Sequence, residues 1–451
     1  MSRKEIAALT IIWGVATLAR VWGVGFGLPY DFHPDEPFII KTALNIVVNK
    51  DFNPHTFTWP PLFIYLNAPL YYLFFLLGKT WGLFRSHLEF LAYYTLDPSY
   101  FILIIRLTSA LFGALTVIPL YLLGRQLGHS TIGLLASALL AVSPLHVENS
   151  HFGKVDVTLT CFILSAMYFL YLSYTRGRLR DYLLFGISAG LATAAKYPAG
   201  LLPLTLLLLS PLLLQREEGK PWYRSYRFAS TYPLLLSLGA YLLALFLGAP
   251  HIFLDFRTFW QDFSALSSMT SVPWLGGEGV ESRFVFYAKL LLVEDFGPLV
   301  GILGVGGVFI LSAQKPREAL VLLTFPVLYY GFFGLSANVF ARYALPLLPT
   351  VLLFVAYAVW WISEVGAVKR RRLHHAVFLL MALVLLGSGA AGMIKVGRRL
   401  SQADTRIIAK EWIETHVPAG SRIVREYYGP PLMSFQQEVE RSRARTLLMG
   451  N

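Results

Sequence analysis

Ionisable side chains gather in short segments that separate long apolar runs of this chain. An acidic pair, Asp35 and Glu36, follows His33 in the first of these segments. A carboxylate can act as a general base toward a hydroxyl group, and cations can stabilise a phosphate leaving group. Further candidates lie near the ends of later apolar runs: Arg106, His146, Glu148, His151, Lys154, Asp156, Lys196 and Arg342. Ionisable residues at membrane depth are functional candidates by default, so this set predicts one site near the outer boundary.

Each candidate also has a structural explanation. The pair at Asp35 could simply favour the start of a helix, where the helix dipole stabilises acidic residues. Asp156 could pair with Lys154, and the other cations could extend toward lipid headgroups. Histidines are often hydrogen-bonded structural residues. The convergence of so many ionisable groups at one level favours a site over all of these explanations together.

The composition identifies the class of protein. Of the 451 residues, 56% are hydrophobic and only 14% are charged, against roughly 25% charged residues in soluble domains. A soluble, disordered or fibrous chain is therefore excluded, and we expect a polytopic membrane protein. The net charge of +12 fits Lys and Arg held on the cytoplasmic side and attracted to anionic membrane lipids, rather than nucleic acid. The single cysteine, Cys161, excludes an intrachain disulfide and a multi-cysteine metal site.

The fold class that we predict is an all-α bundle of about 11 transmembrane helices, since each crossing needs about 20 apolar residues. A further apolar run, 61–78, contains Pro61, Asn67 and Pro69. If this run crossed the membrane, every later loop would invert and the KRRR cluster at 369–372 would face outward. We therefore expect 61–78 to lie at the outer surface. The candidate spans are 6–24, 101–124, 131–147, 157–174, 182–196, 199–214, 229–248, 286–312, 319–335, 343–363 and 375–394.

The expected domains are a membrane domain, 1–397, and a short polar segment, 398–451, on the extracytoplasmic side. The first outer loop, 25–100, contains an amphipathic helix that starts at Pro34 and Asp35, and interfacial helices follow it. A second outer loop, 249–285, carries Gly276, Gly277 and Gly279 and could form a mobile flap. In the polar segment, TRIIAKEWIETH predicts a helix, PAGS a turn and RIV a strand.

Several ordered segments resemble the GT-C glycosyltransferases, over about residues 5–350. The most similar branch is the family-39 type, which includes protein O-mannosyltransferases and lipid A aminoarabinose transferases. The segments are HPDE at 33–36, PPLFIYL at 60–66, RLTSALFGALTVIPLYLLGRQL at 106–127, SPLHVENSHFGKVDVTLT at 143–160, GLATAAKYPAGLLP at 190–203 and FARYALPLLP at 340–349.

This resemblance implies transfer of a hexose or pentose from a polyprenyl-phosphate donor to a lipid, glycan or protein acceptor. The reaction would take place at the outer face of a cell membrane, usually with inversion. Asp35 would be the general base, with Glu36 and Asp156 as further catalytic acidic residues. A divalent metal bound by Asp35 and Asp156 is also expected as a possible cofactor. The expected substrate-binding residues are His33, Arg106, His151, Lys154, Lys196 and Arg342.

One position departs from the family pattern. Related enzymes often carry Lys or His directly before the Pro-Pro pair, where it faces the donor phosphate, but this chain has Trp59. Phosphate binding must then come from Arg106, Lys196, Arg342, His55 or a metal.

Two other functions stay open. A transporter or lipid flippase would show inverted repeats, broken helices with midplane charges and short outer loops, none of which the sequence displays. A non-catalytic partner in surface polysaccharide assembly would not need the carboxylates.

Overall fold

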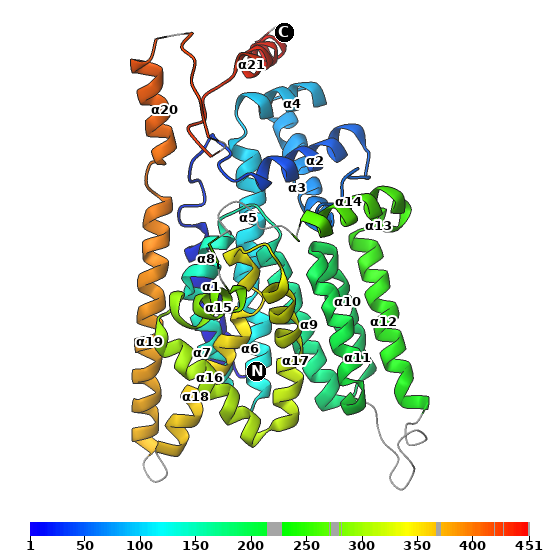
Figure 1. The fold of residues 1–451 in the computed structure, drawn as a ribbon, viewed down its shortest axis with the longest axis vertical. Helices are drawn as coiled ribbons and strands as arrows, with labels where there is room; N and C mark the ends of the chain where they lie inside the picture. The colour runs from blue at the N-terminus through cyan, green and yellow to red at the C-terminus, as the bar shows by residue number, and fades with distance from the viewer. Residues whose placement is uncertain are drawn as a thin grey trace.

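A computed structural model describes residues 1–213, 228–269, 271, 279–280, 282–366, 371–418, 420–426 and 428–449. Within these ranges the regular elements are helices, and there is no strand. The fold is thus an all-α bundle, as the composition and the apolar runs predict (Figure 1).

Most of the chain forms long apolar helices that run roughly parallel to one another (Figure 1). Among the described residues, seven helical segments are long and apolar enough to cross a membrane, or up to nine if each of two bent helix pairs counts as one span. The exact count of about 11 therefore stays a prediction. The bundle comprises α1 (Arg3–Val21), α5 (Ser99–Leu115), α6 (Val117–Gln126), α7 (Ser130–Val142), α8 (Pro144–Ser150), α9 (Asp156–Arg176), α10 (Leu179–Ala195), α11 (Leu201–Leu213), α12 (Phe228–Gly248), α15 (Arg283–Lys289), α16 (Pro298–Gln314), α17 (Pro316–Leu335), α18 (Leu348–Gly366) and α19 (Arg371–Leu400).

A further layer of helices covers one end of this bundle, and we call it the cap (Figure 1). It consists of α2 (Asp35–Asn49), α3 (Leu62–Thr80), α4 (His87–Leu96), α13 (His251–Leu254) and α14 (Phe256–Met269). Figure 1 shows α2, α3 and α4 side by side above the bundle. The amphipathic helix expected from Asp35 is α2, which buries Ile39, Ala43, Leu44 and Val47. By length and composition α3 could also cross a membrane, so its place at the outer surface stays a prediction.

The C-terminal segment continues from α19 past the cap (Figure 1). The helix expected over TRIIAKEWIETH is confirmed as α20 (Thr405–His416). The expected strand at 422–424 is wrong, because these residues have no regular secondary structure and the described part of the chain contains no strand. A further helix, α21 (Phe435–Met449), packs against α4. Of the expected flap glycines, Gly276 and Gly277 lie outside the described residues.

Small residues let α10 and α12 approach each other closely. A Cβ atom on Gly186 would overlap the carbonyl oxygen of Ser237, and one on Gly190 would overlap that of Tyr241. Small residues spaced four apart are a common means of packing helices in membranes, where apolar burial does not favour one partner over another.

We predict that Gly190→Ala lowers the thermal unfolding temperature of the purified protein, because the added methyl group forces α10 and α12 apart. Gly239→Ala on α12 is the matched control, since a Cβ there meets no atom within 4 Å. Alanine has the higher helix propensity, by about 1 kcal/mol, so this control should unfold at an equal or higher temperature. Equal unfolding temperatures for the two variants would contradict the close packing.

Candidate active site

The turn before α2 sets the position of Asp35. Pro34 precedes the helix without a side-chain cap, and the backbone N–H of Asp35 donates instead to His33 Nδ1 at 3.3 Å. The His33 ring packs against Phe152, with ring centroids 4.9 Å apart. Burial, followed by the nearby Lys154 charge, lowers the pKa of His33 to about 3, so the ring is neutral and Nδ1 can accept. His33 thus orients the first residue of α2.

The next residue, Glu36, makes a buried ion pair with Arg106 of α5. Both side chains are 0% exposed, and Arg106 Nε and one terminal nitrogen each donate to a Glu36 oxygen at 2.8 Å. The other terminal nitrogen of Arg106 donates to the carbonyls of Val24 and Phe26. Neither charged residue lines the cavity described below. This placement favours a positioning role, whereas the sequence grouped Glu36 with the catalytic residues and Arg106 with the substrate-binding residues.

A second segment, 143–156, reaches the same ion pair from the bundle. Ser143 caps α8, and the Asp295 carboxylate accepts from the Ser143 hydroxyl and the Leu145 N–H, each at 2.7 Å. After α8 the chain turns, and the Gly153 N–H donates to Glu36 Oε1 at 2.8 Å. Only glycine fits here, because a Cβ atom would overlap Ile105. Lys154 and Asp156 follow within three residues, so Glu36 links the turn that carries Asp35 to the segment that carries Asp156.

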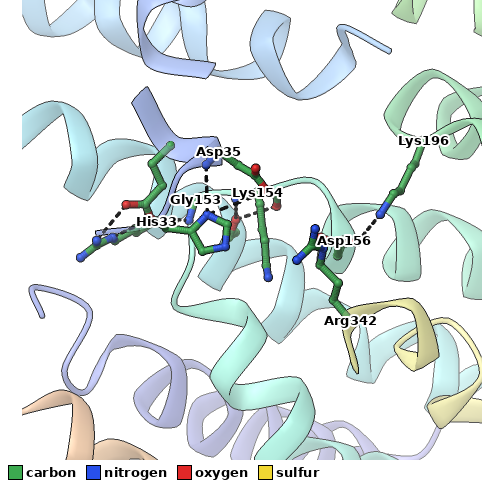
Figure 2. A network of polar contacts seen from close by, with 10 residues as sticks. His33, Asp35, Gly153, Lys154, Asp156, Lys196 and Arg342 are labelled. Atoms are coloured by element: carbon green, nitrogen blue, oxygen red, sulfur yellow. Dashed lines mark hydrogen bonds and ion pairs between the residues drawn. The ribbon is translucent and has the colours of Figure 1, made fainter. Parts of the chain in front are cut away.

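Five charged side chains meet at a cavity between the cap and the bundle. Lys196 Nζ lies 2.6 Å from Asp156 Oδ1, and Arg342 Nε lies 3.9 Å from Asp156 Oδ2. Asp35 and Lys154 face the same space (Figure 2). The cavity has a volume of about 40 Å³, which is room for about one water molecule. The structure thus brings Asp35, Lys154, Asp156, Lys196 and Arg342 together from four segments of the chain.

Helix ends place three of these charges. Asp156 is the first residue of α9, where the helix dipole favours an anion, and Lys196 follows the last residue of α10, where it favours a cation. Arg342 lies in the 3₁₀ turn η4 (Ala341–Ala344), before α18.

Two aromatic residues complete the wall, and sequence reasoning gave neither a function. Lys196 Nζ lies 4.6 Å from the centre of the Tyr343 ring. Trp59 also lines the cavity, and its ring packs edge-on against Phe38 at 5.1 Å. The position of Tyr343 next to Arg342 in the sequence was the one feature that could have indicated a place in the site. The segment before Trp59 is tied to α14, because Phe57 N donates to Asp262 at 2.6 Å.

Burial and charge oppose each other in this site. Burial raises the pKa of the Asp35 carboxyl, although Arg342 and Lys154 act in the opposite direction. Burial lowers the pKa of Lys154 to about 8, against the stabilising charges of Asp156 and Asp35. Asp35 therefore becomes a better base than a solvated aspartate, and Lys154 can lose its proton near neutral pH.

The other expected histidines lie elsewhere. His151 lies between two carbonyl oxygens, with Nδ1 at 2.8 Å from Val147 and Nε2 at 2.9 Å from Trp22. His146 contacts the buried Arg20, and His55 pairs with Asp51 at 2.6 Å on the surface. None of the three lines the cavity. This arrangement favours structural roles for them.

Two carboxylates surrounded by cations offer a divalent metal ion few ligands in this arrangement. The described residues contain no group of three or more His, Cys, Asp or Glu side chains that could hold a metal. Asp156 is already paired with Lys196, and Lys154 and Arg342 add further positive charge. Metal binding by Asp35 and Asp156 stays a prediction, and no step below uses it.

Comparisons with known proteins agree with this architecture. The family model described as dolichyl-phosphate-mannose-protein mannosyltransferase matches residues 101–253. The crystal structure of the Archaeoglobus fulgidus oligosaccharyltransferase superposes with a TM-score of 0.57 at 14% identity, over 98% of this chain. The chain has the GT-C glycosyltransferase fold. A search of curated proteins finds no match.

Other GT-C structures are similar over most of the chain. ArnT from Cupriavidus metallidurans, bound to undecaprenyl phosphate, superposes with a TM-score of 0.52 at 16% identity, covering 98% of this chain and 87% of that one. The archaeal oligosaccharyltransferase has been solved with dolichol-phosphate and an inhibitory peptide, and also with Zn and sulfate. This chain covers only 63% of the archaeal protein in the peptide complex.

We predict that Glu36→Gln strongly destabilises the protein, by roughly 3–5 kcal/mol, because it leaves the Arg106 charge buried without a counter-charge. Thermal unfolding of the purified variant measures this effect. Glu294→Gln is the matched control, since Glu294 pairs with Lys289 where both side chains are largely exposed. Exposed pairs contribute about 0–1 kcal/mol, so equal losses in the two variants would show that the Glu36 pair does not anchor the site.

Proposed function

We propose that the protein transfers a sugar from a polyprenyl-phosphate donor to an acceptor hydroxyl, with Asp35 as the general base. The observation that carries this proposal is the juxtaposition of Asp35 with Lys154, Lys196 and Arg342 around one cavity. A base and a cluster of cations are the two elements that displacement of a phosphate leaving group requires. The GT-C fold supports the assignment, since similar structures hold polyprenyl phosphates.

In the proposed reaction Asp35 takes the proton of the acceptor hydroxyl. The acceptor oxygen attacks the anomeric carbon and forms the new glycosidic bond, while the bond from that carbon to the phosphate oxygen breaks. The polyprenyl phosphate leaves with the bonding electron pair, and Lys154, Lys196 and Arg342 stabilise its negative charge. A single displacement of this kind inverts the configuration at the anomeric carbon.

The donor needs more space than the present cavity has. A volume of about 40 Å³ is far smaller than a sugar phosphate, so part of the wall must move when the donor binds. The segment that carries Trp59 is the best candidate. It has no regular secondary structure before Pro61, and its contacts with neighbouring elements include hydrogen bonds from Asn53 to Asp255 and from Tyr197 to the Phe57 carbonyl.

The charge distribution supports an outer location of the site. The links between α6 and α7, α9 and α10, and α16 and α17 lie at the end of the bundle opposite the cap (Figure 1). These links and the helix turns that adjoin them carry Arg125, Arg176, Arg178, Arg180, Lys315 and Arg317. Short loops rich in Lys and Arg stay in the cytoplasm, so the cap and the site would face outward.

We predict that Asp35→Asn lowers transfer by at least about 100-fold, because asparagine cannot accept the hydroxyl proton. The protein in lipid nanodiscs would be given radiolabelled polyprenyl-phosphate sugars and membrane extract, and label in the acceptor would be counted. Asp51→Asn is the matched control, since Asp51 lies on the surface of the same loop.

Wild-type turnover by the Asp35→Asn variant would remove Asp35 from the mechanism. Absence of both transfer and donor hydrolysis with every donor, by the folded wild-type protein, would overturn the proposed reaction itself.

A second prediction concerns pH. With wild-type protein, kcat/KM should rise through the raised pKa of Asp35, as the base loses its proton, and fall above about pH 8, as Lys154 loses its own. Lys154→Arg should shift the alkaline fall to higher pH, because arginine keeps its charge. An alkaline fall unchanged in this variant would show that a different group titrates there.

A further inference from the structure

A second, larger cavity lies on the other side of the turn that carries Asp35. Its volume is about 690 Å³, within the range of small-ligand sites and large enough for two or three sugar rings. It lies between the cap and the C-terminal segment. Pro34, Pro37 and Phe38 line this cavity, whereas Asp35 and Ile39 line the smaller one. One short turn therefore forms a wall of both cavities.

The C-terminal segment forms the opposite wall through specific contacts. Arg441 on α21 donates to the Leu96 carbonyl at the end of α4 at 2.8 Å. Arg425 donates to the Pro430 carbonyl at 3.1 Å, which closes the loop beside the cavity. The Arg406 guanidinium stacks on Phe32 at 3.7 Å from the ring centre. These contacts make the wall a defined surface.

Positive charge predominates in the lining. Arg406 is paired with Asp404 at 2.6 Å, but Lys41, Arg425 and Arg441 have no carboxylate partner within the described part of the chain. Two carboxylates, Asp31 and Glu440, also line the cavity. Burial raises the pKa of Asp31, which weakens its anionic character. The cations therefore outnumber the carboxylates, and guanidinium groups match the planar geometry of carboxylate and phosphate groups.

Aromatic rings supply the other part of the lining, from Tyr30, Tyr94 and Tyr428 in addition to Phe32. A tyrosine offers a flat apolar face together with a hydroxyl group, which suits a ligand with both C–H faces and hydroxyl groups. A purely hydrophobic ligand would leave the charged groups of the lining unmatched, and a simple anion would leave the rings without contact.

We propose that this larger cavity binds the acceptor, and that the acceptor is a saccharide carrying carboxylate or phosphate groups. The proposal rests on the proposed function, because it names the substrate class of the same transferase. A saccharide seated here would contact the turn at Pro34 and Pro37, and would present a hydroxyl group toward the side where Asp35 acts.

The test measures equilibrium binding, so it does not depend on turnover. Two matched pairs of probes share their sugar rings and differ in whether they carry an anionic group: trehalose 6-phosphate against trehalose, and trigalacturonate against its methyl ester. Citrate serves as an anion without sugar rings. Binding to the protein in nanodiscs would be followed by isothermal titration calorimetry for wild type, Asp35→Asn, Lys41→Gln and Arg425→Gln. Arg422→Gln is the matched control, since Arg422 is exposed on the same segment and does not line the cavity.

At least one charged saccharide should bind about tenfold more tightly than its neutral partner and than citrate. Lys41→Gln and Arg425→Gln should each weaken that binding several-fold, whereas Arg422→Gln and Asp35→Asn should leave it unchanged. The unfolding temperature of Lys41→Gln should equal that of the wild-type protein.

The proposal would be overturned if neither charged saccharide bound, or if the neutral partners or citrate bound as tightly as the charged saccharides. Wild-type affinity in Lys41→Gln and Arg425→Gln would also overturn it. Absence of transfer by the wild-type protein, with binding of a charged saccharide retained, would instead count against the proposed function. Because Asp35→Asn keeps the cavity intact, its binding result separates the two.

Discussion

The buried ion pair between Glu36 and Arg106 is the interaction on which the rest of the site depends. Removing two charges from solvent is costly, and the bidentate geometry together with the Gly153 N–H compensates for that cost. The pair joins the cap, α5 and the loop before α9 at one point. Asp35 directly precedes Glu36 and Lys154 directly follows Gly153, so their positions are coupled. The ion pair therefore fixes the relative positions of charged side chains that lie on separate loops.

The charge balance of the smaller cavity favours an anionic ligand. Lys154, Lys196 and Arg342 face two carboxylates, Asp35 and Asp156. With all five groups charged, one positive charge is left over, and a phosphate would compensate it. A divalent cation would add to the excess instead. Burial of Lys154 reduces this excess of positive charge, because its lowered pKa lets part of the population carry a neutral amine when no anion is bound.

Much of this site follows from sequence because helix ends obey simple rules. Asp156 and Lys196 lie where an anion and a cation are favoured, and the apolar runs place both at one end of the bundle. Spacing along the chain does not reveal which distant residues pair. The sequence therefore suggested separate roles for Glu36 and Arg106, which the structure joins in one ion pair. Helix α21 was also not predicted, because its polar sequence has little apolar periodicity. Packing against α4 stabilises this helix instead.

The two cavities share one turn, but the rest of their walls comes from different parts of the chain. The smaller one is built from helix ends of the bundle, whose positions are determined by tight helix packing and by the Glu36 pair. The larger one owes nearly half of its lining residues to the C-terminal segment, from Arg406 to Arg441, which lies outside the bundle. Substitutions there can alter charge and shape without moving Asp35. Under the proposed function, recognition of the acceptor can therefore diverge while the chemistry at the shared turn stays the same.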